Sequence, residues 1–323
     1  MTEKPKKLGV LTSGGDAPGM NQAIRAVVRT AIYHGMNVVG VRRGYEGLLG
    51  ADVFEMTANS VSDIVHRGGT MLKTARSEEM RKPEGLDRAA QICKVMGFDC
   101  LVVIGGDGSL TGAAELAKRG INVMGIPGTI DMDIPFTEYT IGFDTAVNTG
   151  MEAINKIRDT SSSHERVSVI EVMGRAAGHI ALWCGMAGGA EEIVIAENHV
   201  TDDDVVRQIV SNRGRGKMHN LVVVAEGGGK SERLATRIEE VTGIPTRATI
   251  LGHIQRGGAP SAVDRMHAGV MGNMAVEMFA AGETNRVMLY KKGDYSHMDI
   301  FEALATEAVY DNKLYEIIKI LAI

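Results

Sequence analysis

The sequence predicts an α/β protein of two doubly wound domains, each with a mainly parallel sheet flanked by helices. Short apolar runs rich in β-branched residues recur along the chain, and helical patterns separate them. Continuous apolar strands that alternate with helices are typical of a parallel sheet covered on both faces. A length of 323 residues suits two domains of ~100 to 200 residues each. The expected strands are Leu8–Thr12, Val38–Val41, Leu101–Ile104, Val123–Ile126, Val167–Val172, Ile193–Ala196, Leu221–Ala225, Ala248–Leu251 and Val287–Tyr290.

The first helix is expected between the first two strands. Apolar residues from Met20 to Ile32 keep helical spacing, and Arg25 and Arg29 share another face, four residues apart. Pro18 suits the first turn of this helix, where no amide donor is needed. In doubly wound folds ligands bind at the carboxyl ends of the strands, so the turns that follow strands are the candidate functional segments.

Composition excludes several classes of function. A net charge of -5 and a pI near 6.0 give no overall positive field, so nucleic acid is not an expected partner. No run approaches the ~18 apolar residues of a membrane span. The three cysteines are scattered without C-x-x-C spacing, which favours neither a disulfide framework nor a zinc site. We therefore expect a cytoplasmic protein with no membrane partner.

The turn Ser13–Gly19 follows the first expected strand. Its bare backbone amides and the helix that follows are typical of an anion site. Asp16 stands where a dinucleotide fingerprint needs glycine, and Met20-Asn21 stands where a P-loop needs Lys-Ser or Lys-Thr. The turn alone leaves a phosphate site and a purely structural turn equally open.

Two further turns follow the next pair of strands in the middle of the chain. Gly105–Ser109 opens a helix, and Asp107 there suits either a Mg²⁺ ligand or a helix cap. Pro127–Asp133 carries Asp131 and Asp133, which share one face if the segment is extended. One carboxylate then accepts a proton from an alcohol and the other helps to position metal. A polar loop is the plain alternative, but three such turns at successive strand ends favour phosphate chemistry.

A second set of turns combines cations, a carboxylate and a histidine. Met173–Arg175, Glu226 and His253–Gly258 each follow an expected strand. Arginine binds phosphate oxygens in a planar fork, and glutamate accepts hydrogen bonds from sugar hydroxyls. Each residue alone suits a surface ion pair or a buried histidine, whereas their repetition at strand ends favours a sugar-phosphate site.

Together these residues closely resemble the bacterial-type ATP-dependent 6-phosphofructokinases, and the resemblance runs through nearly the whole chain. The Gly-Gly-Asp-Gly element alone is less specific, because NAD kinases and diacylglycerol kinases carry a similar one. The segments that carry the resemblance are Leu11–Asn21, Gly105–Ser109, Gly128–Asp131, Asp159–His164, Glu171–Arg175 and Leu251–Gly258.

The resemblance implies transfer of the γ-phosphoryl group of Mg-ATP to the 1-hydroxyl of fructose 6-phosphate, the committed step of glycolysis. Asp131 takes the hydroxyl proton and Asp107 holds Mg²⁺. Arg76, with Gly15 and Thr129, completes the implied catalytic set. Implied ATP contacts are Gly15, Arg76, Ser77, Gly106, Asp107, Gly108 and Ser109. Implied fructose 6-phosphate contacts are Thr129, Ile130, Asp131, Arg166, Met173, Gly174, Arg175, Glu226, Arg247, His253, Ile254, Gln255 and Arg256.

The resemblance also implies a homotetramer in which Arg166 and Arg247 reach into a neighbouring subunit's site. An effector site for ADP or phosphoenolpyruvate is implied, although Ala58 and Met218 stand where basic residues are familiar. Its matching residues are Arg25, Arg29, Arg158, Gly189, Glu191, Arg215, Lys217 and His219. The implied ATP-binding domain is 1–140 plus 254–306, and the sugar-phosphate domain is 141–253 plus 307–323.

Three alternatives compete with this interpretation. Pyrophosphate-using relatives commonly carry Asp and Lys at the positions of Gly108 and Gly128, and glycine at both favours ATP. A silent nucleotide-binding regulator would explain Met132, which replaces a familiar Asn, but Arg76, Asp107 and Asp131 are all retained. Ser77 likewise replaces a Phe found near adenine in some members. A kinase of NAD or lipids would leave the Met-Gly-Arg and His-Ile-Gln-Arg segments without a role.

Overall fold

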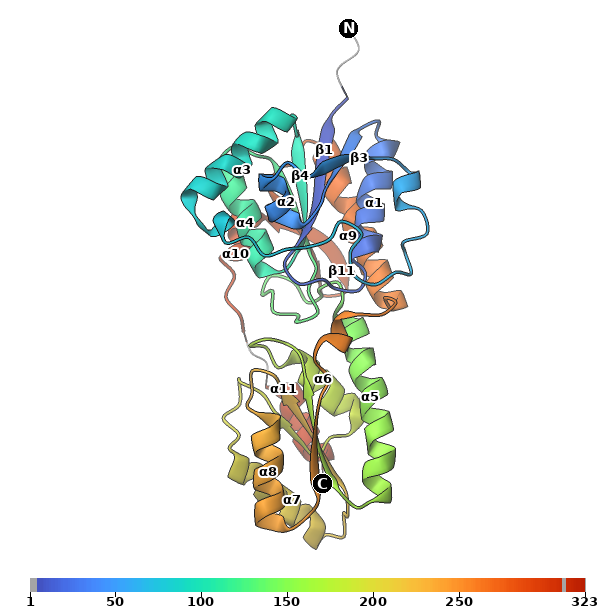
Figure 1. Cartoon of the computed structure of the whole chain (residues 1–323), viewed down its shortest axis with the longest axis vertical. Coiled ribbons are helices and arrows are strands. Elements are labelled where there is room, and N and C mark those ends of the chain that lie inside the picture. Colours follow the sequence, from blue (N-terminus) through green and yellow to red (C-terminus); the bar gives the residue numbers. More distant parts are fainter. Residues whose placement is uncertain (1–4, 310–311, 323) are drawn as a thin grey trace. The chain divides into compact units, whose positions relative to one another are not determined.

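A computed structural model describes residues 5–309 and 312–322, which form two compact units (Figure 1). Unit 1 contains the described residues up to Ile130, together with Ile134–Asp144 and Arg256–Ala308. Unit 2 contains Asp131–Asp133, Thr145–Gln255 and the described residues from Val309 onward. The ATP and sugar-phosphate roles expected for 1–140 plus 254–306 and for 141–253 plus 307–323 remain predictions. No helix within the described residues is long and apolar enough to cross a membrane.

Unit 1 is built on a sheet of seven strands in the order β11-β10-β5-β4-β1-β2-β3. The five central strands run parallel, and the edge strands β3 and β11 pair antiparallel with β2 and β10. The strands are β1 (Lys7–Ser13), β2 (Asn37–Val41), β3 (Val53–Met56), β4 (Cys100–Gly105), β5 (Val123–Pro127), β10 (Arg286–Lys291) and β11 (Asp294–Asp299).

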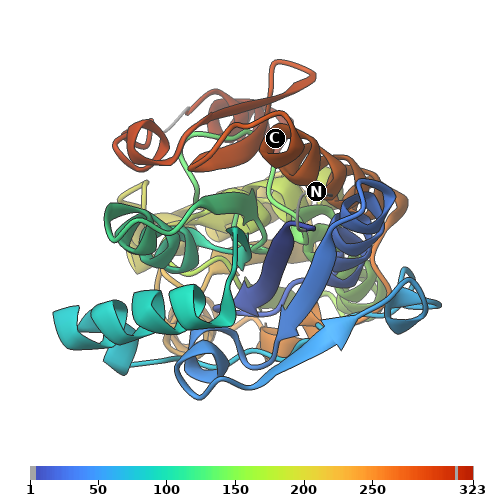
Figure 2. The same ribbon diagram turned by 90° about the horizontal axis from the view of Figure 1, so that it is seen from above.

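Helices cover both faces of this sheet, as Figure 2 shows from above. On one face α1 and α9 pack against each other. On the other face α2, α3, α4 and α10 enclose a core that includes Leu11, Leu101 and Val103 from the strands. The helices of unit 1 are α1 (Met20–Tyr33), α2 (Gly44–Leu49), η1 (Asn59–Val61), η2 (Glu79–Arg81), α3 (Pro83–Met96), α4 (Asp107–Lys118), α9 (Ala262–Ala280) and α10 (Ile300–Leu304).

Unit 2 is a smaller parallel sheet in the order β7-β8-β6-β9. Helices α7 and α8 bury one face, and α6 packs on the other with α11 against it. The strands are β6 (Val167–Val172), β7 (Glu192–Val194), β8 (Asn220–Ala225) and β9 (Thr246–Ile250). The helices are α6 (His179–Gly188), α7 (Asp202–Gly214), α8 (Ser231–Thr242) and α11 (Lys313–Leu321), while α5 (Phe143–Ser163) begins in unit 1 and η3 (Gly252–Arg256) ends there.

All nine expected strands are present, with ends shifted by at most two residues. The α/β class and the mainly parallel sheets are therefore confirmed. Two local expectations were wrong. Pro18 lies outside the first helix, because the helix begins at Met20 after the left-handed cap Gly19. The segment from Asp131 to Asp133 is not extended, because Met132 has a left-handed φ of 52°.

The strand order of unit 1 changes direction at β1. The chain moves from β1 to β2 on one side, and β4 lies on the other side of β1. In doubly wound folds, ligands bind at the carboxyl ends of the strands where the direction changes in this way. Ser13, Gly105 and Pro127 are direct neighbours across β1, β4 and β5. The three turns predicted to bind phosphate therefore start side by side.

Close packing of β1 against the start of α4 gives a stability prediction. A Cβ on Gly105 would collide with the Ser13 backbone oxygen and lie 2.6 Å from Ser109 Oγ. Gly105→Ala should therefore destabilise the protein by about 1 to 3 kcal/mol. Gly108→Ala is the matched control, because a Cβ there meets nothing within 4 Å and alanine favours a helix. Urea unfolding of both variants checks this, and an equal loss of stability in the two would contradict it.

Candidate active site

The end of β1 and the turn after it are hydrogen-bonded to a distant coil by two threonine side chains. Thr74 Oγ1 donates to the backbone oxygen of Gly14 at 2.7 Å, and Thr12 Oγ1 donates to that of Lys73 at 2.9 Å. Arg76 follows two residues after Thr74 and is exposed. The two threonines therefore bring the Arg76 segment to the Ser13–Gly19 turn, as the predicted nucleotide site requires. Thr74 was missed in the sequence, because this coil has no periodicity that indicates its contacts.

The turn after β4 leads into the first amides of α4, and no side chain caps them by a hydrogen bond. Gly106 caps the helix and Asp107 is its first residue. Tyr45 Oη donates to the Ser109 backbone oxygen at 2.6 Å, and this hydrogen bond fixes the first turn of α4. Gly108 has open space where its Cβ would stand. This arrangement suits an oxyanion, because unpaired N–H groups and the helix dipole both favour negative charge.

Asp107 is the carboxylate that the sequence predicts to hold Mg²⁺ at this turn. Its side chain is exposed at the amino end of α4. Among the described residues no group of three or more His, Cys, Asp or Glu side chains forms a metal cluster. Mg²⁺ bound with a nucleotide needs no such cluster, because phosphate oxygens and water complete its shell beside one or two carboxylates. The single exposed Asp107 fits that mode of binding.

The turn after β5 carries the predicted proton acceptor. Asp131 is buried, with 2% of its surface exposed. The residue after it, Met132, is in the left-handed conformation, which costs a non-glycine residue roughly 1 to 2 kcal/mol. Asp133 Oδ2 accepts from Arg175 Nη1 at 2.9 Å. The chain therefore bends between the two carboxylates, and Asp133 is paired with an arginine.

In unit 2 the carboxyl ends of the strands bring the expected sugar-phosphate residues together. Glu226 Oε1 accepts from the backbone nitrogen of Arg175 at 2.6 Å. Gln255 is fully buried, and its Oε1 accepts from the backbone nitrogen of Met173 at 2.8 Å. Its Nε2 donates to the backbone oxygen of Ala146 at 3.1 Å. The buried Gln255 therefore fixes the backbone of the Met173 turn, while the side chains of Arg175 and Glu226 remain exposed.

Other members of the expected sugar-phosphate set lie apart from this cluster. Arg166 precedes β6 and Arg247 is the second residue of β9, so both lie at the amino ends of their strands. Arg256 belongs to unit 1, where its Nη1 donates to the Asp16 backbone oxygen at 3.3 Å. A Cβ on Gly15 would be 2.6 Å from that same Nη1. The exposed His253 and Ile254 lie in η3, whereas Thr129 and Ile130 stay in unit 1.

The expected effector residues are distributed over both units. In unit 2, Arg158 Nη2 donates to the backbone oxygen of Gly189 at 3.0 Å. Lys217 Nζ lies 2.7 Å from Oε1 of the buried Glu191, so the two charges largely offset each other. Arg215 donates to Asn212 Oδ1. The remaining members are His219, which is half-buried in unit 2, and Arg25 and Arg29 on α1 of unit 1.

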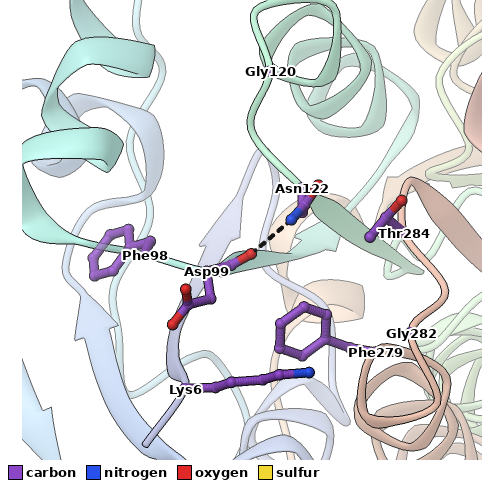
Figure 3. A pocket seen from close by; sticks show the side chains of 8 residues that line it. All are labelled: Lys6, Phe98, Asp99, Gly120, Asn122, Phe279, Gly282 and Thr284. Atoms are coloured by element: carbon purple, nitrogen blue, oxygen red, sulfur yellow. Dashed lines mark hydrogen bonds between the residues drawn. The ribbon is translucent and has the colours of Figure 1, made fainter. Parts of the chain in front are cut away.

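A separate cavity of about 370 Å³ lies at the amino ends of the unit 1 strands, opposite the phosphate turns (Figure 3). Its lining precedes β1, β4 and β5, and includes Lys6, Asp99 and Asn122. Asn122 Nδ2 donates to the Asp99 backbone oxygen at 3.0 Å. None of the predicted site residues lines this cavity. Ligand binding at the carboxyl-end turns can therefore be compared directly with binding at this amino-end cavity.

Comparison with known proteins agrees with this geometry. Residues 7–279 match the phosphofructokinase family. The chain is 57% identical to an ATP-dependent 6-phosphofructokinase of Clostridium botulinum (strain Loch Maree / Type A3) over 98% of this chain and 99% of the relative. It is 56% identical to the ATP-dependent 6-phosphofructokinase of Clostridium tetani, with the same coverage of both chains.

Solved structures give the same result. The phosphofructokinase of Saccharomyces cerevisiae has a TM-score of 0.85 and 37% identity, and the match covers 93% of this chain and 45% of the yeast chain. This chain thus spans less than half of the yeast protein. A pyrophosphate-dependent phosphofructokinase from Marinobacter aquaeolei has a TM-score of 0.83 at 23% identity, over 95% of this chain and 86% of that one, which shows the shared fold. The chain therefore belongs to the phosphofructokinase family.

Proposed function

We propose that the protein transfers the γ-phosphoryl group of ATP to the 1-hydroxyl of fructose 6-phosphate and produces fructose 1,6-bisphosphate and ADP. The observation that carries the proposal is the alignment of three glycine turns at one edge of the unit 1 sheet, where Ser13, Gly105 and Pro127 are neighbours. The names of the relatives at 56% and 57% identity support the same reaction. A cytoplasmic location remains the expectation from the sequence.

The residues of unit 1 account for binding of the phosphate chain. The first amides of α4 and the Ser13–Gly19 turn donate to phosphate oxygens. Arg76, held nearby through Thr74, stabilises negative charge on the transferring group. Asp107 would hold Mg²⁺, which would supply further neutralisation of phosphate charge when bound. Phosphoryl transfer needs little else from the protein beyond such positioning and charge stabilisation.

Asp131 supplies the proton acceptor in this proposal. Its carboxylate follows Thr129 by two residues and is almost fully buried, so water competes weakly for it. A carboxylate within hydrogen-bond reach of the sugar hydroxyl removes its proton as the new bond to phosphorus forms. The cluster of Met173, Arg175 and Glu226 in unit 2 holds the sugar phosphate by hydrogen bonds to phosphate and hydroxyl oxygens.

The choice of donor depends on two glycines that differ in their surroundings. A Cβ on Gly128 would lie 3.2 Å from Met20 Cε and 3.3 Å from Ile104 Cγ2, so packing alone favours glycine there. A Cβ on Gly108 meets no protein atom within 4 Å, so packing gives no reason for that glycine. Open space beside the first amides of α4 suits the α-phosphate of a nucleotide. Gly108 is therefore the residue that favours ATP over pyrophosphate.

The donor itself is the first test. The purified protein is offered fructose 6-phosphate and Mg²⁺ with either ATP or pyrophosphate, and fructose 1,6-bisphosphate is measured. We expect product with ATP and at least about a hundredfold less with pyrophosphate, because losing the nucleotide contacts removes several kcal/mol of binding. Product with pyrophosphate alone contradicts the donor assignment. A protein that binds ATP but forms no product from either donor fits the silent regulator.

A second prediction concerns Asp131. Asp131→Asn removes the proton acceptor but preserves the shape of the side chain, so kcat should fall by ~10² to 10⁴-fold while both substrates still bind. Asp203→Asn changes an exposed carboxylate on α7 and serves as the control with unchanged kcat. Steady-state kinetics and a Tm measurement check both variants. A folded Asp131→Asn protein with nearly unchanged kcat would remove Asp131 from this role.

The position of two arginines supports sites shared between subunits. Arg166 precedes Val167 and Met173 follows Val172 in β6. At ~3.3 Å per residue the strand separates them by roughly 20 Å. Arg247 pairs in register with Ser168 and lies at the same end as Arg166. Neither arginine reaches the Met173 cluster of its own sheet, which is consistent with the proposed homotetramer in which they serve a neighbouring subunit.

Subunit exchange provides the third prediction. An Asp131→Asn protein and an Arg247→Ala protein, each weak alone, should regain activity when mixed tetramers form, because some sites then contain neither defect. The recovered activity should be a sizeable fraction of the wild-type rate. Native mass spectrometry confirms that subunits have exchanged. Verified mixed tetramers without any gain would mean that each site is built within one chain.

A fourth prediction concerns effectors. Arg25 and Arg29 are one turn apart on α1, whereas Ala58 and Met218 are neutral and Lys217 is paired with Glu191. Each missing contact to a charged phosphate removes ~1.5 to 3 kcal/mol, so we propose a weak ADP or phosphoenolpyruvate site. Either effector should shift the half-saturation for fructose 6-phosphate only modestly, and Arg25→Ala should abolish the shift with little change in maximal rate. A strong response that persists in Arg25→Ala would place regulation elsewhere.

A further inference from the structure

A buried carboxylate behind the phosphate turns is not part of the set predicted from the sequence. Asp264 lies in the first turn of α9 and has no exposed surface. Its Oδ1 accepts from Tyr139 Oη and from the backbone nitrogen of Gly142, both at 2.6 Å. The backbone nitrogen of Asp264 donates to Ser261 Oγ, which caps the helix. The carboxylate therefore joins α9 to the segment Tyr139–Gly142.

The segment Tyr139–Gly142 in turn holds the end of β5. The backbone nitrogen of Ile141 donates to the Pro127 backbone oxygen at 3.0 Å, and Ile141 forms a parallel bridge with Gly128. Thr140 Oγ1 donates to the Thr129 backbone oxygen at 2.7 Å. The proposed catalytic turn is thus fixed through this segment, and Asp264 bonds the segment on both sides of Thr140.

Asp264 and the segment Tyr139–Gly142 also pack against the Ser13–Gly19 turn. A Cβ on Gly19 would lie 2.6 Å from Ile141 Cγ2 and 3.5 Å from Asp264 Cβ. A Cβ on Gly142 would lie 2.6 Å from Ala17 Cβ and 3.2 Å from Ile130 Cγ2. All of these residues belong to unit 1. The segment Tyr139–Gly142 is therefore in contact with both turns, and neither turn can shift far while it stays in place.

Tyr139 is held so that its hydroxyl faces Asp264. Its ring stacks on His267, with centroids 3.8 Å apart and an interplanar angle of 20°. Burial, and then the charge of Asp264, raise the pKa of Tyr139 far above its ordinary value. The phenol consequently keeps its proton and acts as a donor. Hydrogen bonds to an ionised acceptor are short and strong, as the 2.6 Å distance illustrates.

We propose that Asp264 is a positioning residue for phosphoryl transfer, which holds the Pro127–Asp131 turn and the Ser13–Gly19 turn in register through Tyr139 and Gly142. The role rests on the proposed function. Asp264 touches neither substrate in this account, and its effect passes through the backbone of Thr129. A displacement of about 1 Å in reacting groups can lower a rate ~10²-fold, so loosening this anchor should reduce kcat more than it raises KM.

Three variants distinguish a role for the hydrogen bonds of Asp264 from a role for the volume of its side chain alone. Asp264→Ala removes the acceptor, and kcat should fall ~10 to 100-fold with the KM for each substrate changed less than about threefold. Asp264→Asn retains an oxygen that can accept both hydrogen bonds, so kcat should recover to within about threefold of wild type. Tyr139→Phe removes one donor and preserves the stacked ring, and an intermediate loss of kcat is expected.

Met271→Ala is the control for stability alone. Met271 is buried on the same helix, two turns further along, and its truncation should lower Tm with kcat per folded molecule unchanged. If Asp264→Ala loses kcat, Asp264→Asn restores it and Met271→Ala retains it, the proposal is supported. A wild-type kcat in folded Asp264→Ala, or an equal loss in Met271→Ala, overturns it. If Asp264→Ala does not fold, an unchanged kcat in Tyr139→Phe overturns it instead.

Amide hydrogen exchange makes the test independent of the reaction. Without substrates, the amides of residues 128–131 should exchange faster in Tyr139→Phe than in wild type or Met271→Ala, because their support is weakened. Unchanged exchange there overturns the positioning role even if the protein has a different activity. A wild-type protein that forms no product with ATP, together with faster exchange in Tyr139→Phe, would instead contradict the proposed function and leave the anchor supported.

Discussion

The register of three parallel strands is the constraint on which the unit 1 site depends. Ser13, Gly105 and Pro127 are direct neighbours across β1, β4 and β5, so three turns leave the sheet at the same level. Gly105 has no side chain, which lets the backbone of β1 approach the first turn of α4. The helix amides, Asp107 and the Thr129 backbone then occupy one edge, and phosphate chemistry follows from the charges that this edge presents.

The central strands could be predicted from the sequence because burial on both faces leaves continuous apolar runs, such as Leu101–Ile104. The edge strands β3 and β11 were missed. β11 (Asp294–Asp299) is polar and carries no clear alternation, and Glu55 interrupts the short apolar run of β3 (Val53–Met56). Neither segment therefore shows the continuous apolar run that marks the central strands. Candidate site residues in turns could be predicted for the same reason as the strands, since the turns begin where the apolar runs end.

The supporting residues could not be found in this way. Asp264 lies at the start of a helix more than a hundred positions beyond Thr129, and Ser-x-x-Asp at 261–264 indicates only a helix cap. Gln255 stands within a predicted site segment, yet the structure buries it and commits both ends of its amide to backbone. Tertiary packing decides such roles, because the partners are unrelated in sequence position.

Met132 has a structural explanation that bears on the silent-regulator alternative. Its φ of 52° lies in the left-handed region, which Asn enters more readily than Met. The bend between Asp131 and Asp133 therefore gives a conformational reason for the Asn that is familiar at this position. Met132 adds strain to that bend but removes no group that the proposed chemistry uses, and Asp107, Asp131 and Arg76 remain in place.

The central claim is that ATP binds at the carboxyl edge of the unit 1 sheet, and hydrogen exchange with and without Mg-ATP tests it most directly. The account predicts slower exchange for the amides of residues 13–17, 19 and 106–108, which would donate to phosphate oxygens. Residues 97–99 and 120–122, beside the cavity at the opposite edge, should be unchanged. Protection at that cavity with no protection at the two turns would contradict the account.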